Sequence, residues 1–430
     1  MKKRRAGIVL IVTVVIAVAG FMCMKSNIAG VDEIKNNSIL TMAGSATKNE
    51  PDETESLKNN DQEKKQDEKP KRKDETITIT SLGNIMFHDS QIKFAKTANG
   101  YDFKPSFKYL KDMVSSSDLS LAVFEGSFVN KSYQGYPLFR TPDEVADALK
   151  DCGVSILNEA SNHVFDGAES GMKRTRDTAI NKGIDVIGIK NENTDRNYII
   201  KEIKGYKIGL VAYTYETEKI KGRKAINGIP LTSSGEEYIN TFNYNELKDF
   251  YSKLENQISD MKKEGADYVI VSLHWGDEYV HKPNTYQKAI ASKLNELGVD
   301  IILGNHPHVV QSYNTLTSQN GHKTFVIYGQ GNTLSNQSAV LLKEPGVEDG
   351  YIAQFTLECK DTGVSIKDYS MIPIFLYRET KNNGGYYNRI VPIVEALKDR
   401  KKYGLNDIAA GTANQSLKRT ESVIGTNNIK

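Results

Sequence analysis

The chain has 430 residues, of which 39% are hydrophobic and 26% are charged, so it is long and apolar enough to bury a sizeable core. Its formal net charge is only +2, because 56 Lys and Arg residues are balanced by 54 Asp and Glu residues. Without a global basic field, or a basic stripe with interleaved aromatic side chains, the sequence predicts no nucleic-acid partner.

The N-terminus combines a basic start with a long uncharged run. Met1–Arg5 reads MKKRR, and Ala6–Met24 is rich in Val and Ile. A run of this length is about what a bilayer requires, and the positive-inside rule keeps such a start in the cytoplasm. Residues 1–25 are therefore predicted to form a cytoplasmic start and a transmembrane helix. A cleaved signal peptide is the alternative, since Ala17-Val18-Ala19 resembles a cleavage site.

The segment after the apolar run is polar. Residues 26–75 contain few aromatic side chains, and 48–75 consist almost entirely of Lys, Glu, Asp, Asn and Gln. Such a segment cannot bury enough apolar surface to offset its ordering entropy, so we expect a disordered stalk. The single-pass anchor then places the C-terminal domain outside the cell membrane.

From residue 76 to about 395, short β-rich runs alternate with helical ones, which is typical of an α/β fold. The predicted strands are 76–82, 119–124, 154–157, 185–188, 208–213, 268–273, 300–303 and 324–328, with further strands over 351–357 and 364–373. The predicted helices are 105–114, 142–152, 169–182, 246–264 and 286–297. Residues 396–430 are weakly patterned and predicted to form a polar C-terminal tail.

Clusters of potential ligand side chains follow five of these strands. They contain Asn84 with His88 and Asp89, Glu125, Asn162 with His163 and Asp166, His274 with Glu278, and His306 with His308. The carboxyl ends of strands in an open α/β sheet meet at one edge, where ligands bind. We therefore expect these groups to share one cleft.

The chemistry of the clusters points to a metal. Imidazole combined with carboxylate and amide oxygen suits Zn, Mn or Fe better than Ca or Mg. Two histidines one residue apart, His306 and His308, can reach the same ion only on a tight turn, which Gly304 and Pro307 favour. Trp275, the only tryptophan, is interpreted as a core residue. Cys152 and Cys359 are expected to be separate buried thiols, with a disulfide as the alternative.

The motifs resemble those of the CapA family of poly-γ-glutamate capsule synthesis proteins, whose domain is similar to calcineurin-like metallophosphatases. The matching stretches are SLGNIMFH (81–88), FEGSFV (124–129), SNHVFDGAESG (161–171), SLHWGDEY (272–279), GNHPHVVQ (304–311) and, more weakly, YGQGN (328–332). The resemblance implies a four-layer α/β/β/α sandwich with the cleft at one end.

The resemblance also implies roles for individual residues. Metal ligands are expected at Asn84, Glu125, Asn162, His274, His306 and His308. His163 is expected to protonate a leaving oxygen, with Asp166 orienting it and Glu278 supporting a histidine in the same way. The family usually has Gly-Asp where this chain has Gly83-Asn84. With Glu125 as the one clear carboxylate ligand, we predict one firmly bound divalent metal and a second that is weak or absent.

Three hypotheses for the function follow. The first is a membrane-anchored protein of capsule biosynthesis or export, with membrane-bound polymer synthase subunits and a polyanion such as poly-γ-glutamate as partners. The second is a metal-dependent phosphoesterase, a hydrolase in which a metal-activated water attacks phosphorus. The third is a non-catalytic scaffold that binds the polymer in an inherited cleft.

Overall fold

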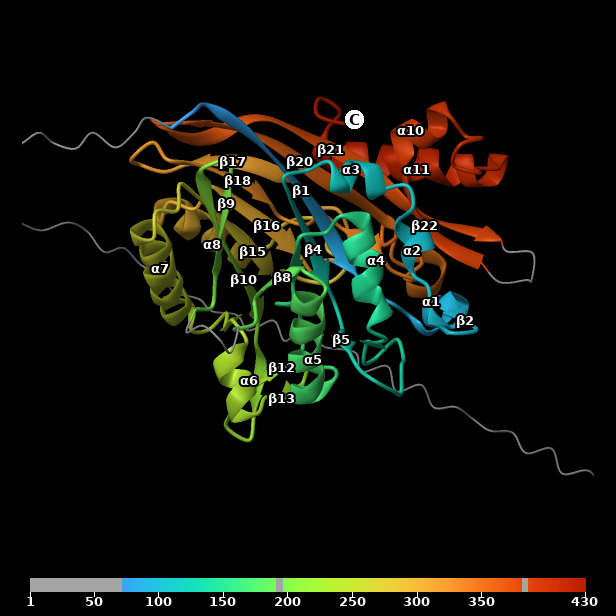
Figure 1. Cartoon of the computed structure of the whole chain (residues 1–430), viewed down its shortest axis with the longest axis horizontal. Coiled ribbons are helices and arrows are strands. Elements are labelled where there is room, and N and C mark those ends of the chain that lie inside the picture. The colour runs from blue at the N-terminus through green and yellow to red at the C-terminus, as the bar shows by residue number, and fades with distance from the viewer. Residues whose placement is uncertain (1–71, 191–195, 381–385) are drawn as a thin grey trace, which may run out of the picture. The chain divides into compact units, whose positions relative to one another are not determined.

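Two β-sheets with helices on their outer faces make up the folded part of the chain (Figure 1). The computed structural model describes residues 72–190, 196–380 and 386–430. The predicted transmembrane helix and nearly all of the predicted stalk lie outside these residues. Among the described residues, no helix is both long and apolar enough to cross a membrane.

The first sheet has the strand order β22-β21-β20-β1-β4-β7-β8, and β19 pairs with β1. Its strands are β1 (Glu75–Ile85), β4 (Leu119–Phe124), β7 (Ile156–Asn158), β8 (Asp185–Ile187), β19 (Asn332–Leu334), β20 (Asp349–Lys360), β21 (Gly363–Thr380) and β22 (Tyr386–Pro392). Strands β1, β4, β7 and β8 are parallel, whereas β20, β21 and β22 extend the sheet in antiparallel fashion. The sheet is therefore mixed.

The second sheet has the order β14-β10-β15-β16-β18-β17, and β9 pairs with β10. Its strands are β9 (Ile199–Ile203), β10 (Tyr206–Tyr215), β14 (Thr241–Phe242), β15 (Tyr268–His274), β16 (Ile301–Asn305), β17 (Tyr313–Thr317) and β18 (Lys323–Ile327). Strands β10, β15, β16 and β18 are parallel. The outer pairs β9–β10 and β17–β18 are antiparallel.

Short strands and helices complete the fold. The short strands are β2 (Lys96–Thr97), β3 (Gly100–Tyr101), β5 (Ser127–Phe128), β6 (Arg140–Thr141), β11 (Thr217–Ile220), β12 (Arg223–Ile226) and β13 (Ile229–Pro230). The helices are α1 (Asp89–Ala95), α2 (Lys104–Phe107), α3 (Lys111–Ser115), α4 (Glu144–Cys152), α5 (Ala168–Asn181), α6 (Ser233–Tyr238), α7 (Leu247–Lys263), α8 (Thr285–Glu296), α9 (Ala339–Leu342), α10 (Ile393–Lys398) and α11 (Asp407–Ile424). The single helix predicted over 105–114 is thus divided into α2 and α3.

The core consists of three hydrophobic layers, which make the fold a four-layer α/β/β/α arrangement. Successive side chains of a strand point to opposite faces, so Leu121 of β4 packs between the two sheets and Ala122 packs under the helices. The layer between the sheets joins Ile79 and Ile156 to Ile208, Ile270 and Ile301. Strands covered on both faces are nearly all apolar, and this explains why the sequence showed continuous hydrophobic runs.

Helix α7 shows how the outer layers form. Its side chains Phe250, Leu254, Ile258 and Met261 recur every three or four residues and are buried against the second sheet. This apolar stripe lies within the helix predicted over 246–264. Burying each such side chain contributes about 1.5–3 kcal/mol. On the opposite side, α4 and α5 cover the first sheet in the same way.

The C-terminal segment differs from the predicted polar tail. Residues 407–424 form α11, which packs with α10 on β21 and β22 through a separate apolar cluster that includes Phe375, Tyr403 and Ala413. The buried positions of α11 carry mainly small residues, Ala409, Ala413, Ser416 and Thr420, so its amphipathic pattern is weak in sequence. The two predicted core thiols, Cys152 and Cys359, are free and buried, as expected.

At Gly304, the backbone of β16 lies very close to Tyr328 and Trp275, and the position of the strand end depends on this close contact. A Cβ atom there would lie 2.3 Å from the carbonyl oxygen of Tyr328 and 2.5 Å from Nε1 of Trp275. Trp275 is fully buried and donates from Nε1 to the same Tyr328 carbonyl at 2.9 Å, which confirms it as a core residue. No side chain larger than hydrogen fits at position 304.

We expect Gly304→Ala to lower the free energy of unfolding by about 1–3 kcal/mol, because the added methyl group overpacks a rigid backbone contact. Urea denaturation of the purified protein measures this change. Gly411→Ala is the matched control, because Gly411 lies in α11 with open space at the Cβ position. The control is expected to raise stability by about 0.5–1 kcal/mol. Equal stability of the Gly304→Ala variant and the wild type would contradict the role given to this glycine.

Candidate metal centre

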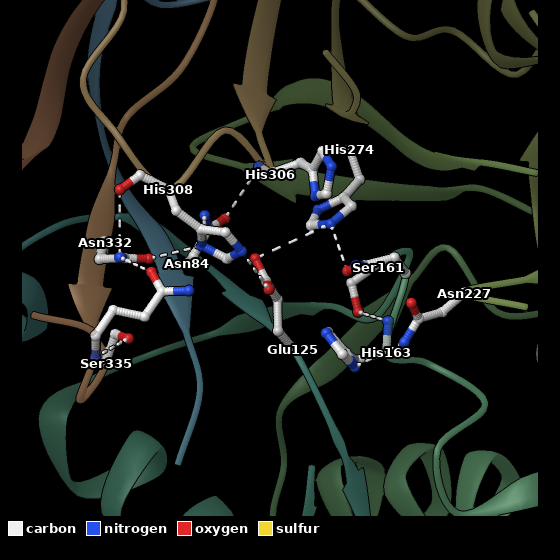
Figure 2. Close-up of polar contacts among 12 residues, drawn as sticks. Asn84, Glu125, Ser161, His163, Asn227, His274, His306, His308, Asn332 and Ser335 are labelled. Carbon is white, nitrogen blue, oxygen red and sulfur yellow. Dashed lines mark hydrogen bonds and ion pairs between the residues drawn. The ribbon is translucent and has the colours of Figure 1, made fainter. Parts of the chain in front are cut away.

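The predicted polar clusters meet at the carboxyl ends of the parallel strands. Asn84 lies at the end of β1, Glu125 directly follows β4, and His274 ends β15. Asn162 and His163 lie in the turn after β7, and His306 and His308 follow β16. Figure 2 shows Glu125 between His308 on one side and the His274 and His163 region on the other. Two sheets thus contribute to one site.

The carboxylate of Glu125 is at the centre of the cluster and is fully buried. Its Oε2 lies 3.6 Å from Nε2 of His308, and its Oε1 lies 4.0 Å from Nε2 of His274. Within the described residues, neither oxygen has a hydrogen-bond partner. A buried carboxylate without partners is strongly unfavourable unless a proton or a cation compensates its charge.

The ionisation of the cluster follows from its burial. Burial raises the pKa of Glu125 well above its usual value, and the nearby charges of Glu278 and Asp166 raise it further. Burial lowers the pKa values of His274 and His306 well below the usual value, and that of His308 to about 4. The imidazoles are therefore neutral at pH 7, which is the form that binds metal ions.

Asn162 and His274 face each other across the two sheets. The Oδ1 atom of Asn162 lies 2.9 Å from Nε2 of His274. Ligand atoms at about 2.0–2.2 Å from one tetrahedral or octahedral ion are themselves roughly 3 Å apart. The spacing of this pair is therefore suited to two ligands of a single ion. His306 offers a further donor, because its Nδ1 is buried and has no partner among the described residues.

The loop from Gly304 to His308 is the tight turn that the sequence predicted. His306 and His308 both have positive φ angles, 97° and 58°, which are unusual for residues other than glycine. The surrounding contacts hold this conformation, since the Pro307 carbonyl accepts a hydrogen bond from the backbone N–H of Tyr279 at 2.8 Å. Strained backbone of this kind accumulates at functional sites.

Asn84 contacts this loop directly. Its Oδ1 accepts the backbone N–H of His306 at 3.3 Å, and its amide nitrogen lies 3.2 Å from Nδ1 of His308. Asn84 is fully buried. Its carbonyl oxygen, which was the predicted ligand atom, is used to position the histidine loop. The role of Asn84 as a metal ligand therefore stays a prediction that this geometry does not favour.

His163 and Asp166 form a buried pair beside the cluster. Nδ1 of His163 lies 2.7 Å from Oδ2 of Asp166, and the same oxygen accepts the backbone N–H of Phe139 at 2.6 Å. The ring of Phe139 also packs edge-on against His163, with ring centroids 4.6 Å apart. Burial raises the pKa of Asp166 despite the bond from His163. This arrangement fixes the imidazole so that Nε2 remains available for proton transfer.

Glu278 was predicted to orient a histidine from outside the ligand set, but its carboxylate lies close enough to His306 and His308 to share an ion with them. The possible ligand atoms of Glu278, His306 and His308 all lie within 4.8 Å of one another. Glu278 is exposed, so its carboxylate lies at the open side of the buried cluster. It is a second candidate carboxylate ligand beside Glu125.

His88 and Asp89, which belong to the predicted clusters of potential ligands, both hold neighbouring loops. Nδ1 of His88 accepts the backbone N–H of Asn336 at 3.2 Å, and Oδ1 of Asp89 accepts that of Gly135 at 2.8 Å. Burial lowers the pKa of His88 to about 4. These contacts give the two residues a structural role in the walls of the site.

Sequence reasoning missed two residues of the site. Asn332 lies 3.0 Å from Nδ1 of His308 through Oδ1, and Tyr215 packs on His306 with ring centroids 4.9 Å apart. Asn332 belongs to the YGQGN stretch, which was recognised but given no role. Tyr215 ends β10, and the carboxylate that follows it, Glu216, accepts a hydrogen bond from Lys224. Only the proximity of the strands reveals these two contacts.

The residues present fit a divalent cation. The site combines neutral imidazoles, an amide oxygen and a buried carboxylate whose oxygens have no partner among the described residues. A cation would supply the missing compensation for Glu125, and imidazole with carboxylate and amide oxygen suits Mn, Fe or Zn. The donor set therefore supports the predicted metal.

Comparisons with known proteins show the family to which the chain is similar. The sequence profile of a family described as bacterial capsule synthesis protein PGA_cap matches residues 78–337. The chain is 27% identical over 306 residues to the capsule biosynthesis protein CapA of Bacillus anthracis, covering 69% of this chain and 67% of that protein. It is also 27% identical over 314 residues to the PGA biosynthesis protein CapA of Bacillus subtilis strain 168, covering 71% and 73%.

One solved structure that aligns with this chain is the calcineurin-like phosphoesterase YfkN from Bacillus subtilis. It aligns with 81% of this chain and 99% of its own, at 14% sequence identity and a TM-score of 0.37.

The buried carboxylate of Glu125 provides a test of the metal centre. Its pKa in the folded, metal-free protein is above that of the unfolded chain, so the charged form opposes folding, increasingly as pH rises above the unfolded-state pKa. We expect Glu125→Gln to stabilise metal-free protein at pH 7.5 by about 0.5–2 kcal/mol. Added Mn²⁺ or Zn²⁺ is expected to raise the Tm of the wild type but not that of the variant. Thermal unfolding with and without metal measures both effects.

Metal analysis of the dialysed samples completes this test. We expect one stoichiometric equivalent in the wild type and none in Glu125→Gln. Thr324→Val is a control at a buried polar site at the amino end of β18, whereas the cluster lies at the carboxyl ends of the parallel strands. Two firmly held equivalents in the wild type would contradict the prediction of a single ion, and equal metal content in the Glu125 variant would contradict the role of the carboxylate.

Proposed function

The chain belongs to the family of bacterial capsule synthesis proteins, and from this premise we propose that it takes part in making or exporting an extracellular polyanion such as poly-γ-glutamate. The match to residues 78–337 is the observation that carries the proposal. All of the predicted site residues, from Asn84 to His308, fall inside this range. Two relatives named for capsule or PGA biosynthesis support the same function.

The working part of the protein is the buried cluster at the carboxyl ends of the strands. We assign Glu125, Asn162, His274, His306 and His308 as the residues that would hold a divalent metal, with Glu278 at the open side. A bound divalent ion supplies Lewis-acid chemistry, polarising an oxygen of the substrate or lowering the pKa of a water. The orphaned oxygens of Glu125 are the specific feature that supports this assignment.

His163 is the proposed proton donor beside this centre. Asp166 accepts the Nδ1 proton of His163, which keeps Nε2 directed toward the site and fixes the tautomer. The charge of Arg140 acts on the same pair, since it lowers the pKa of Asp166. The site thus contains a cationic side chain and a positioned imidazole, which together suit an anionic substrate whose leaving oxygen needs a proton.

The location outside the membrane remains part of the proposal. It rests on the basic start and the uncharged run of residues 6–24, which lie outside the described residues. An anchored domain would work beside the membrane-bound subunits of a polymer synthase, which we propose as its partners. The polymer itself is the proposed polyanionic ligand of the cleft.

Complementation tests the capsule function. In a host whose own copy is deleted, we expect the wild-type gene to restore surface polymer and Glu125→Gln to restore less than a tenth of it, because the variant lacks the charge that holds the metal. Immunochemical quantification of the glutamate polymer on the cell surface measures the effect. Gly411→Ala serves as the folded control and should behave like the wild type.

The same strains test the anchor and the function together. Fractionation is expected to recover the wild-type protein with membranes, and recovery in the soluble fraction would contradict a retained anchor. Unchanged surface polymer in the deletion strain would contradict the capsule function itself.

Phosphoester hydrolysis is a second candidate, favoured by the His163–Asp166 pair next to the metal-binding donors. We expect turnover of an aryl phosphate in the presence of Mn²⁺ or Zn²⁺, lowered about 10²–10⁴-fold in His163→Ala because the general acid is lost. The loss should be smaller with a good leaving group, which needs little protonation. Absence of turnover with every divalent ion tried would instead favour a scaffold that binds polymer without chemistry.

A further inference from the structure

The strongest feature beyond the proposed site is an ion pair between a buried carboxylate and a partly exposed guanidinium, which joins the C-terminal helix to the start of β20. Asp349 is 2% exposed, and its two carboxylate oxygens accept hydrogen bonds from Nε and Nη2 of Arg419 in α11, both at 2.7 Å. A two-pronged pair of this kind fixes orientation as well as distance, because the guanidinium plane matches the carboxylate. Both residues lie beyond residue 337, where the family match ends.

Asp349 closes a turn that supports Asn332. The backbone N–H of Asp349 donates to the carbonyl of Gly346 at 3.0 Å, and the carbonyl of Val347 within this turn accepts Nδ2 of Asn332 at 2.9 Å. The contact between the two segments is tight. A Cβ atom on Gly350 would lie 2.3 Å from the carbonyl oxygen of Asn332, so a displacement of the turn cannot leave Asn332 in place.

Asn332 in turn influences which ring nitrogen of His308 carries the proton. Its amide nitrogen donates to the carbonyls of His308 and Val347 and to the side chain of Gln337, which fixes the direction of the amide group. Oδ1 of Asn332 is therefore an acceptor 3.0 Å from Nδ1 of His308. This acceptor favours a proton on Nδ1 of His308, which leaves the lone pair of Nε2 free on the side of Glu125. The amide nitrogen of Asn84, a donor 3.2 Å from the same Nδ1, favours the opposite tautomer, so the shorter contact with Asn332 has to outweigh it. Figure 2 shows these contacts of Asn332 with His308.

The geometry points to Arg419 as a positioning residue of the metal centre, which acts through Asp349, the 346–349 turn and Asn332 to hold His308 in its ligating tautomer. This inference rests on the proposed metal centre and deepens it. It also assigns a function to the C-terminal helix, which the sequence alone predicted to be part of a polar tail. The effect of Arg419 is transmitted through hydrogen bonds and through the backbone of the 346–349 turn that connects them.

The test uses the purified full-length chain with Arg419→Met, which keeps much of the aliphatic stem and removes both donors. We expect affinity for Mn²⁺ or Zn²⁺, measured by competition with a chelator, to fall about tenfold, as for the loss of other outer contacts of metal ligands. Arg419→Lys keeps the charge but not the paired geometry, so it should restore affinity only in part. Asn332→Ala, which removes the last link, should lower affinity at least as much.

The control is Arg400→Met. Arg400 also pairs with α11, but its partner Asp407 is 96% exposed at the first residue of the helix. We expect this variant to bind metal like the wild type. Thermal unfolding of the metal-free proteins identifies any variant that fails to fold. Unchanged metal affinity in a folded Arg419→Met variant, with lowered affinity in Asn332→Ala, would overturn the inference.

A metal-independent measurement separates this inference from the proposed function. NMR of the ring nitrogens in histidine-labelled, metal-free protein reports the tautomer of each imidazole. For His308 we expect the Nδ1–H form in the wild type and in Arg400→Met, and a mixture of tautomers in Arg419→Met. If the wild type binds no metal, the proposed centre fails, while the NMR comparison still decides the inference. The same His308 tautomer in all variants would overturn it.

Discussion

A single buried carboxylate governs the arrangement of the site. Glu125 lies at the carboxyl end of β4 with both oxygens excluded from water and without partners among the described residues. Burial, reinforced by the nearby charges of Glu278 and Asp166, raises its pKa well above the usual range, and burial lowers the pKa of His274. An ionised carboxylate without compensation is too costly to keep in a folded interior. A divalent cation would compensate the charge of this carboxylate. The neutral imidazoles and the amide oxygen around it are groups that could bind the same cation.

The two sheets make this placement possible. Donors from β1, β4 and β7 approach from the first sheet, and His274, His306 and His308 approach from the second. The hydrophobic layer between the sheets sets the separation of these groups, and the close contact at Gly304 lets β16 end against Trp275 and Tyr328. The contact at Gly304 therefore contributes to packing and also positions the loop that carries His306 and His308. Side chains that pack the sheets together also bring the ligands within reach of one ion.

Outside the ligands, a set of amide and carboxylate side chains controls orientation. Asn84 holds the backbone of His306, Asn332 offers an acceptor to Nδ1 of His308, and Asp166 accepts the Nδ1 proton of His163. Contacts of this kind commonly tune metal affinity by one to two orders of magnitude. The family membership gives the biological setting, and these contacts explain how the chain could organise a metal there with an asparagine at position 84. The C-terminal helix extends the same network beyond the part of the chain that the family shares.

The sequence by itself determined the α/β class, most central strands, the apolar stripe of α7 and the residue types gathered at the strand ends. These features depend on local periodicity and on residue chemistry, which a linear pattern carries. The tertiary structure alone decided that Asn84 serves the His306 backbone, that Asn332 contacts His308, and that residues 407–424 form a packed helix. Those outcomes depend on groups up to 224 positions apart, as in the pair Asn84 and His308, and on small buried residues with little hydrophobic signal. No local pattern encodes such contacts, because they arise only when the two sheets pack.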